Sequence, residues 1–367
     1  MTKAKKPTVR KAARAAANPG ADDVVVYGAT GYTGRLAARA MERAGLSMVL
    51  AGRNRESLER LAAEFDDEHP IAVARHDDPG GLVELAERGS VLVSTAGPFS
   101  EIGDLTVAAA VKAGRNYLDS TGEVGFMART HRRHHETARE KGIVVVNACA
   151  FEYVIGDSAV ALAMEGKHPA EVRVSYWLPI KAMTHGTALS ANGVLFGSKQ
   201  PGLFKSHQID FPGVGRKWAV TYPGGEIEFM RRRHPEVATS TLMDLPPMLA
   251  RSAGIMPRVG PLLSFGPVKA LMNAIVSRQP AGPSPEQRAE QEWLVLVEVD
   301  HGGSKGSGVV ARGRDPYGLT AEILARSAAR VVAGKTRASG VLAPSEAFEP
   351  ADVLDSLADL GVSWERF

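Results

Sequence analysis

The residues with the clearest chemical meaning lie at positions 28–34, which read GATGYTG. They separate a short apolar run at 24–27 from a helical pattern at 34–44. A glycine turn that leads into a helix suits a phosphate group, because unpaired backbone N–H groups and the helix dipole favour negative charge there. The segment therefore predicts a dinucleotide-binding loop.

Each glycine of this loop has an expected task. Gly28 should permit the tight turn, Gly31 should let the pyrophosphate approach the backbone, and Gly34 should bring the helix close to the sheet. The neighbouring side chains of the loop should lie beside the cofactor; they are Thr30, Tyr32 and Thr33. The spacing is G-x-x-G-x-x-G, whereas many NAD sites have G-x-G-x-x-G.

The end of the second predicted strand indicates which nicotinamide cofactor binds. An NAD site has an acidic residue there that binds the ribose 2′-hydroxyl. This chain has Arg53 and Asn54 instead, and its first acid is Glu56. An arginine matches a 2′-phosphate in charge and geometry, so we expect NADP(H) and place both residues in the cofactor site. Asp77, after the third strand, could meet the adenine or cap the next helix.

Two further segments should reach the same edge of the sheet. Thr95, Ala96, Gly97 and Pro98 follow the fourth strand, and residues 117–123 (YLDSTGE) close the fifth. Ligands of open α/β sheets bind at the carboxyl ends of the strands, so we assign the first four residues to the cofactor site. Both segments also have the composition of ordinary turns.

Short apolar runs alternate with helical patterns through the first 150 residues. The six predicted strands lie near 24–27, 48–51, 71–74, 91–93, 117–118 and 143–146. Such runs indicate a parallel sheet buried on both faces, and hence a Rossmann-type, doubly wound α/β domain. Longer strands at 172–178, 293–299 and 309–311 predict a second, α+β domain built on a mixed or antiparallel sheet. Helices are expected near 318–333 and 350–360, on either side of a turn-rich stretch at 334–344.

These patterns divide the chain into four parts. We expect a basic disordered tail at 1–20, an NADP-binding Rossmann domain at 21–155 and a substrate or dimerisation domain at 156–317. Helices at 318–367 should pack back on the Rossmann domain. The tail carries six basic residues and no acid, whereas the whole chain is +3, so the remaining 347 residues are mildly acidic. The tail also has the composition of an organelle transit peptide, and that alternative stays open.

Composition excludes several classes of protein. A near-neutral body is not the footprint of nucleic-acid binding. Cys149 is the only cysteine, which excludes a disulfide framework and a multi-cysteine zinc site. His131 and His135 are spaced like metal ligands, but two arginines stand between them, so we expect a solvated helix face and no metal. The sequence has neither a secretory signal nor a spanning segment, and we expect a cytoplasmic protein.

The stretch at 245–280 combines Leu, Met and Pro with scattered basic residues. It could be a core helix or a homodimer contact, which we favour because apolar helical segments usually lie in cores. It could also form an apolar cover for a lipidic substrate and touch a membrane surface.

Together these motifs resemble the saccharopine dehydrogenase-like oxidoreductases, and among them the bacterial branch of trans-acting enoyl reductases. The resemblance rests on residues 28–34, on AGRN at 51–54, on AGPF at 96–99 and on YLDSTGE at 117–123. It also includes 146–157, DPY at 315–317 and GVLAP at 340–344. It implies a Rossmann domain joined to an α/β domain, NADPH as cofactor, and reduction of a C=C bond in a polyketide or lipid-like substrate that is hydrophobic or carrier-bound.

The resemblance also implies that residues 150–157 form a loop near the nicotinamide. The branch has Gly-Phe-Asp-Ser followed by Pro and Asp, whereas this chain reads AFEYVIGD. We therefore take Tyr153, Glu152 and Asp157 as candidate catalytic residues; Asp157 could instead cap a helix. His185 could line the opposite wall of the site. Two alternatives stay open: a C=N oxidoreductase of the saccharopine type, and a non-catalytic NADPH-binding sensor.

Overall fold

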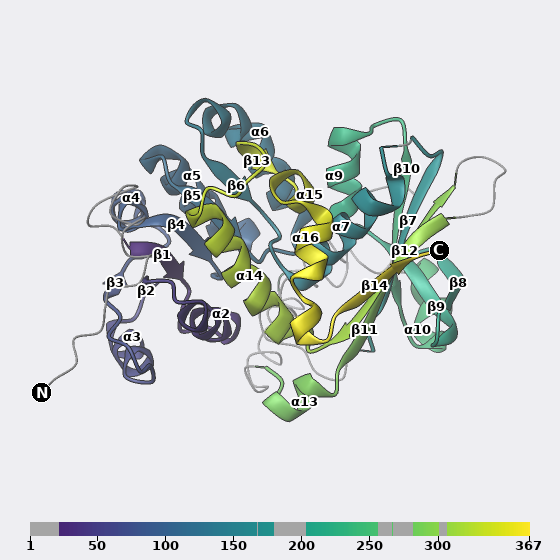
Figure 1. Ribbon diagram of the computed structural model, residues 1–367, viewed down its shortest axis with the longest axis horizontal. Helices are drawn as coiled ribbons and strands as arrows, with labels where there is room; N and C mark the ends of the chain where they lie inside the picture. Colours follow the sequence, from purple (N-terminus) through teal and green to yellow (C-terminus); the bar gives the residue numbers. More distant parts are fainter. Residues whose placement is uncertain (1–21, 167, 180–202, 256–265, 267–281, 301–306) are drawn as a thin grey trace, which may run out of the picture.

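A computed structural model of the chain describes residues 22–166, 168–179, 203–255, 266, 282–300 and 307–367 (Figure 1). The predicted tail at 1–20, His185 and most of the 245–280 stretch lie outside the described residues. Two sheets of seven strands each form the two sides of the molecule, and helices α7 and α14 lie between them (Figure 1).

Sheet A is the predicted Rossmann-type sheet, and every strand pair in it is parallel. Its strands follow the order β13-β6-β5-β4-β1-β2-β3, so the strand order reverses between β1 and β4 while all strands stay parallel. They are β1 (Asp22–Tyr27), β2 (Met48–Gly52), β3 (Ile71–Val73), β4 (Gly89–Ser94), β5 (Asn116–Asp119), β6 (Val144–Val146) and β13 (Gly340–Leu342). The fold class predicted from the alternating pattern is confirmed.

Helices cover both faces of sheet A, which explains its continuous apolar strands. All five residues of β2 are buried, for example. The helices of this half are α2 (Tyr32–Arg43), α3 (Arg55–Ala62), α4 (Pro79–Glu87), α5 (Phe99–Ala113) and α6 (Val124–Glu140).

The seventh strand of sheet A corrects the sequence analysis. The stretch at 334–344 was expected to be turn-rich, but β13 lies within it and pairs with β6. Three residues give too short a periodic signal to identify a strand, and their partner lies almost two hundred positions earlier in the chain. Sheet A is therefore completed by residues far beyond its other strands.

Sheet B is mixed: β7 and β10 are parallel, and its other strand pairs are antiparallel. Strands β8, β9, β10 and β14 were not predicted. The strand order is β14 (Ser363–Arg366), β12 (Ser307–Arg314), β11 (Glu292–Asp300), β7 (Glu171–Trp177), β10 (Ala238–Asp244), β9 (Gly215–Tyr222) and β8 (Ser206–Phe211). Its helices are α9 (Gly225–Arg233), α10 (Pro247–Ser252), η1 (Ala253–Ile255) and α13 (Pro285–Ala289).

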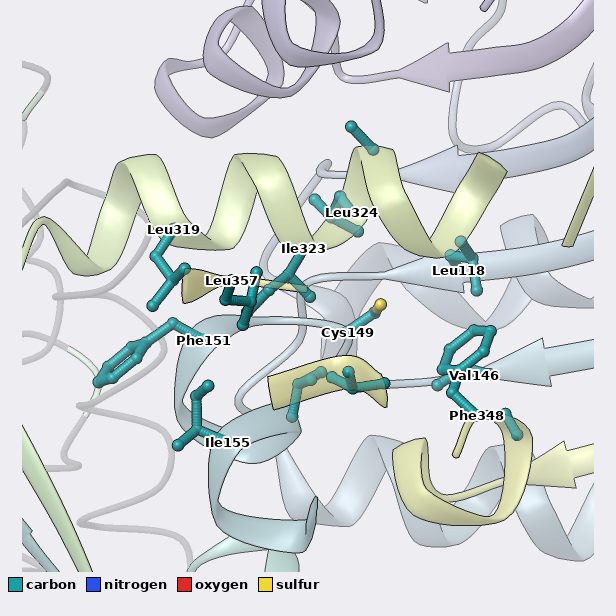
Figure 2. Close-up of a cluster of buried hydrophobic side chains, with 14 of the residues drawn as sticks. Leu118, Val146, Cys149, Phe151, Ile155, Leu319, Ile323, Leu324, Phe348 and Leu357 are labelled. Atoms are coloured by element: carbon teal, nitrogen blue, oxygen red, sulfur yellow. The ribbon is translucent and has the colours of Figure 1, made fainter. Parts of the chain in front are cut away.

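Two central helices join the sheets into one core. Helix α7 (Phe151–Met164) leaves the end of β6 and runs to sheet B, so the predicted loop at 150–157 is wrong and the predicted domain limit at 155/156 falls inside a helix. Helix α14 (Pro316–Val332) lies against α2 and α7. Figure 2 shows Leu319, Ile323 and Leu324 of α14 in one cluster with Leu118 of sheet A and Phe151 of α7. The remaining helices are α15 (Pro344–Ala347), α16 (Pro350–Asp355) and η2 (Ala358–Leu360).

A search of the described residues finds no helix that is long and apolar enough to cross a membrane. Of the 245–280 stretch, residues 245–255 and 266 are described. Met248, Leu249 and Ile255 expose their side chains there.

The central core predicts the effect of one substitution. Leu324 is fully buried between the two sheets. Leu324→Ala should lower the free energy of unfolding by about 2–5 kcal/mol, because a cavity remains where the side chain was. Urea unfolding followed by circular dichroism measures this loss. Met248→Ala, at a side chain that is 82% exposed, is the control and should change stability by less than about 0.5 kcal/mol. Equal effects of the two substitutions would contradict the central role of α14.

Candidate active site at the carboxyl edge of sheet A

The predicted phosphate loop connects β1 to α2 at the point where the strand order reverses. Gly28 has φ +85°, a backbone conformation that L side chains rarely adopt. A Cβ on Gly34 would lie 2.8 Å from the Thr95 hydroxyl oxygen and 2.9 Å from Cα of Ala29. The Thr95 hydroxyl donates to the carbonyl of Gly28 at 3.2 Å, so the segment after β4 is bound directly to the loop. Thr95 and the glycines therefore form one surface.

The centre of the loop leaves room for a ligand. Gly31 is the exposed N-cap residue of α2, and no side chain of the described residues caps that helix. A Cβ on Gly31 would meet only the carbonyl oxygen of Gly28, at 3.3 Å. The loop thus offers the uncapped start of a twelve-residue helix beside open space, an arrangement that fits a pyrophosphate.

The loop also contacts the second half of the chain. The Tyr32 hydroxyl donates to the carbonyl of Pro283 at 2.6 Å, and the Tyr32 ring packs edge-to-face against Tyr317 at 5.6 Å. Burial raises the pKa of Tyr32 to about 12, so this phenol stays protonated and can donate at any physiological pH. Tyr317 belongs to the DPY segment of the family resemblance.

At the end of β2, Arg53 is exposed and makes no ion pair within the part of the chain that the structure describes. Asn54 lies beside it, but its side chain caps α3 by accepting from the N–H of Ser57 at 2.9 Å. Asp77 binds Arg75 through two hydrogen bonds, and Asp78 caps α4, so the helix-capping alternative for Asp77 is wrong. Arg53 can thus bind a 2′-phosphate without giving up an existing ion pair.

Buried carboxylates organise the ends of β4, β5 and β6. Glu123 accepts from the N–H groups of Phe99 and Ser100, both at 2.8 Å, and so holds the start of α5. Asp119 accepts from the N–H of Ala148 and from the side chain of Asn147. Burial raises the pKa of Asp119 to about 6, although these hydrogen bonds oppose the rise.

The first turn of α7 brings two candidate acids to this edge. The Tyr153 side chain is buried, and its hydroxyl donates to the carbonyl of Gly122 at 3.4 Å. Glu152 is half-buried and accepts from the Tyr222 hydroxyl of sheet B at 2.8 Å. Burial raises the pKa of the Glu152 carboxyl, which favours its protonated form, although the Tyr222 hydrogen bond opposes this.

Asp157 lies on another side of the same helix. It is fully buried, forms an ion pair with Arg233 of α9 and accepts from the N–H of Ser345 at 2.8 Å. It sits inside α7, whose N-cap is Ala150, so Asp157 does not cap this helix. Its contacts join α7 to α9 and α15, and they favour a structural role over a catalytic one.

Sequence reasoning missed four residues that contribute to this edge. Asp119 and Glu123 stand in a segment that drew attention as a whole but not residue by residue. Tyr176 and Tyr222 come from sheet B, and nothing in their local sequence indicates that they meet Glu152. The signal that could have found them is the position of each tyrosine near the carboxyl end of its strand.

Other reactive side chains lie apart from the edge or are inert. Burial raises the pKa of Cys149 to about 12, so its thiol does not ionise near neutrality. His131 and His135 are half-buried rather than solvated. Among the described residues, ligand atoms of His168, His234 and Glu236 lie within 4.8 Å of one another, at the surface. Hydrogen-bonding of His168 to Glu236 at 3.2 Å accounts for much of that closeness.

A groove of about 380 Å³ lies between α2 and α14. Arginines line it, but each has a carboxylate partner: Arg39 with Glu64, Arg43 with Glu322, Arg314 with Glu292, and Arg288 with Asp315. The groove does not include the glycine loop, so it is not the dinucleotide site.

Comparison with known protein families agrees with this geometry. The family model of the saccharopine dehydrogenase NADP binding domain matches residues 24–146. The glycine loop and strands β1 to β6 therefore lie in a segment that is similar to this NADP-binding domain. Over these residues the predicted resemblance to this family is confirmed, and so is the prediction of NADP(H) as cofactor.

Individual relatives narrow the resemblance. A putative trans-acting enoyl reductase of Mycobacterium tuberculosis is 37% identical over 149 residues, which cover 39% of this chain and 36% of that protein. The trans-acting enoyl reductase of Mycobacterium leprae is 35% identical over 140 residues, or 37% of this chain and 34% of that protein. The match thus spans about a third of the length of these relatives.

The fold of the whole chain also has a solved counterpart. Saccharopine dehydrogenase (L-Glu forming) from Saccharomyces cerevisiae superposes with a TM-score of 0.59 over 94% of this chain and 99% of that chain. Only 11% of the residues are identical, so the likeness concerns the fold. It extends across both sheets.

The open space at Gly31 generates a prediction. Gly31→Val should abolish binding of NADPH and NADH, because the side chain occupies the place of the pyrophosphate. The melting temperature should stay within about 2 °C of wild type, since Gly31 has φ −71° and few neighbours. Gly34→Val is the contrasting variant and should fail to fold. Fluorescence titration and thermal melts measure both effects, and wild-type affinity in Gly31→Val would remove the site.

Arg53 generates a second prediction. Arg53→Ala should weaken NADPH binding about 10- to 150-fold, the size of one lost charge-assisted contact, and leave NADH binding unchanged. Arg55→Ala, which removes an exposed arginine in the same turn, is the matched control. Isothermal titration with both cofactors decides the matter. An equal loss for both cofactors would mean that Arg53 supports the fold instead.

Proposed function

We propose that the protein is an NADPH-dependent reductase of a C=C bond in an enoyl substrate that is hydrophobic or carrier-bound, of polyketide or lipid type. The observation that carries the proposal is the meeting of Glu152 and Tyr222 beside the carboxyl edge of an NADP-binding sheet. The mycobacterial relatives, which are named as enoyl reductases, support the reaction class.

The chain's own residues divide the work of such a reaction. The loop around Gly31 binds the pyrophosphate and Arg53 the 2′-phosphate. NADPH, when bound, supplies a hydride ion, which is one hydrogen with two electrons. The second hydrogen reaches the substrate as a proton. That proton needs a donor within hydrogen-bond reach of the reacting carbon.

Glu152 suits the role of proton donor better than Tyr153. Residue Glu152 keeps part of its exposure whereas Tyr153 is buried, and burial of the Glu152 carboxyl favours its protonated form. The Tyr153 hydroxyl is buried and engaged with Gly122, and burial raises its pKa well above the usual value. We assign the donor role to Glu152, with Tyr222 orienting its carboxyl, and a supporting role to Tyr153.

A second reaction class has one observation in its favour. The whole-chain likeness to saccharopine dehydrogenase suits a C=N oxidoreductase. A non-catalytic NADPH-binding sensor is the third candidate. A carrier-bound substrate, a homodimer, contact with a membrane surface through 245–280, absence of nucleic-acid binding and a cytoplasmic location remain predictions from the sequence.

The experiment measures NADPH oxidation with enoyl thioesters of increasing chain length and, separately, with 2-oxo acids plus amines. Turnover of the thioesters alone supports the enoyl reductase. Turnover of the second set alone would replace it by the C=N reaction, and no turnover in either set would leave the sensor.

Glu152→Gln tests the donor directly. Turnover should fall about 10²- to 10⁴-fold, the usual contribution of a positioned acid, at unchanged NADPH affinity. Tyr153→Phe should have a smaller effect. Glu171→Gln, at the opposite end of β7 from Tyr176, is the control for loss of a carboxyl group and should keep wild-type turnover. Unchanged turnover in Glu152→Gln would refute the assignment.

A further inference from the structure

A buried tyrosine–glutamate pair lies directly beneath the first turn of α7. Tyr176 of β7 and Glu226 of α9 are both fully buried, and they are hydrogen-bonded to each other. The same Tyr176 hydroxyl also lies 3.0 Å from the main-chain carbonyl oxygen of Glu152. One phenol thus faces two oxygen atoms.

The two contacts fix the position of one proton. A carbonyl oxygen can only accept, and a phenol has a single hydrogen to donate. If Tyr176 donates to Glu152, the hydrogen between Tyr176 and Glu226 must come from Glu226. Both hydrogen bonds can therefore exist together only while the Glu226 carboxyl is protonated.

The surroundings of Glu226 favour this neutral form. Burial raises its pKa to about 8, and the negative charge of Asp157 acts in the same direction, whereas the bonds to Tyr176 and to its own backbone oppose the rise. The second carboxyl oxygen, Oε2, is buried with no hydrogen-bond partner among the described residues.

The groups that face this pair come from each neighbouring element. Helix α7 contributes Glu152, Tyr153 and Asp157; β7 contributes Tyr176; β9 contributes Tyr222; and β10 contributes the uncharged Thr241. Burial lowers the pKa of His131 of α6 to about 4, and Arg232 and Arg231 of α9 act in the same direction. No cationic group contributes to the raised pKa of the Glu226 carboxyl.

Helix α7 carries a glycine at the point of contact. A Cβ on Gly156 would overlap both the Tyr176 hydroxyl and the Glu226 carboxyl. Glycine inside a helix is less stable than alanine by about 1 kcal/mol, so its place here is explained by the room that the pair requires.

We infer that Glu226 is a positioning residue of the proposed reductase: as a neutral acid it donates to Tyr176, which frees Tyr176 to hold the Glu152 carbonyl and fix the first turn of α7. The inference rests on the proposed function for its catalytic meaning. When Glu226 loses its proton, the carboxylate takes the hydrogen of Tyr176, and the Glu152 carbonyl loses its donor. The turn that carries Glu152 and Tyr153 is then less firmly held.

The protonation state is tested by thermal melts of wild type and Glu226→Gln between pH 5 and 9. A raised pKa in the folded state means that the carboxyl favours folding most at low pH, and that this advantage falls between about 4.5 and 8. The melting temperature of wild type minus that of Glu226→Gln should therefore fall by about 3 °C or more across this window. Glu228→Gln removes a carboxylate of the same helix that is paired with Arg231, and it should show no such fall. A constant difference for Glu226→Gln would overturn the inference.

The positioning role is tested by amide hydrogen exchange, which needs no substrate. Protection of the amides of residues 154–156, corrected for the chemical exchange rate, should drop about 3- to 10-fold in wild type between pH 6.5 and 9, the size of one lost hydrogen bond. Glu226→Gln, whose amide donates to Tyr176 at every pH, should show no drop. Unchanged protection in wild type would overturn the inference even if the variant does not fold.

Measurements of turnover test whether Glu226 affects catalysis. With an enoyl thioester, kcat of wild type should fall as pH rises, and ionisation of Glu226 near pH 8 should steepen the fall that the ionisation of Glu152 causes. KM for NADPH should stay constant, and Glu226→Gln should show a shallower alkaline limb. The same alkaline limb in both forms would refute the role in catalysis. If no form turns over any thioester, the proposed function fails, while the exchange and melting results still decide the state of Glu226.

Discussion

The burial of helix α7 between two sheets is the constraint on which the rest of the structure depends. Eleven of its fourteen residues are buried, so the charged groups on this helix need partners within the protein. Asp157 finds Arg233 and Ser345, and Glu152 finds Tyr222. These partners belong to other elements, so satisfying the polar groups of one helix also fixes the positions of α9, α15 and β9.

The part of the molecule that could be predicted is the part whose signals are local. The glycine loop and the apolar strands of sheet A contain their own pattern, because turn, strand and helix follow within about thirty residues. Arg53 was proposed as a cofactor residue because one position in that pattern distinguishes two cofactors. The α7 segment was misread as a loop because a helix that is apolar all round shows no amphipathic period. The partners of Asp157 and Glu152 lie 70 or more positions away, and no short-range pattern records them.

The comparisons divide the chain in the same way. The family model ends at residue 146, just before the turn that leads into α7, and the mycobacterial relatives match over about a third of their length. Sheet B lies beyond the family model, and yet it supplies Tyr176 and Tyr222 to the edge where the cofactor domain ends. The hydrogen bonds that hold Glu152 at this edge therefore come from residues outside the match to the cofactor domain.

Strand β13 gives the family boundary a physical consequence. Residues 24–146 are recognisable as an inherited unit, but their sheet ends at β6, whose outer edge is covered by residues 340–342. As an isolated fragment, this unit would present unpaired backbone N–H and C=O groups along β6. Such an exposed edge can pair with other chains and favours aggregation. The segment that matches the family model is thus shorter than the unit that completes sheet A. Exchange of the module with that of a relative would require the distant closing strand to be exchanged with it.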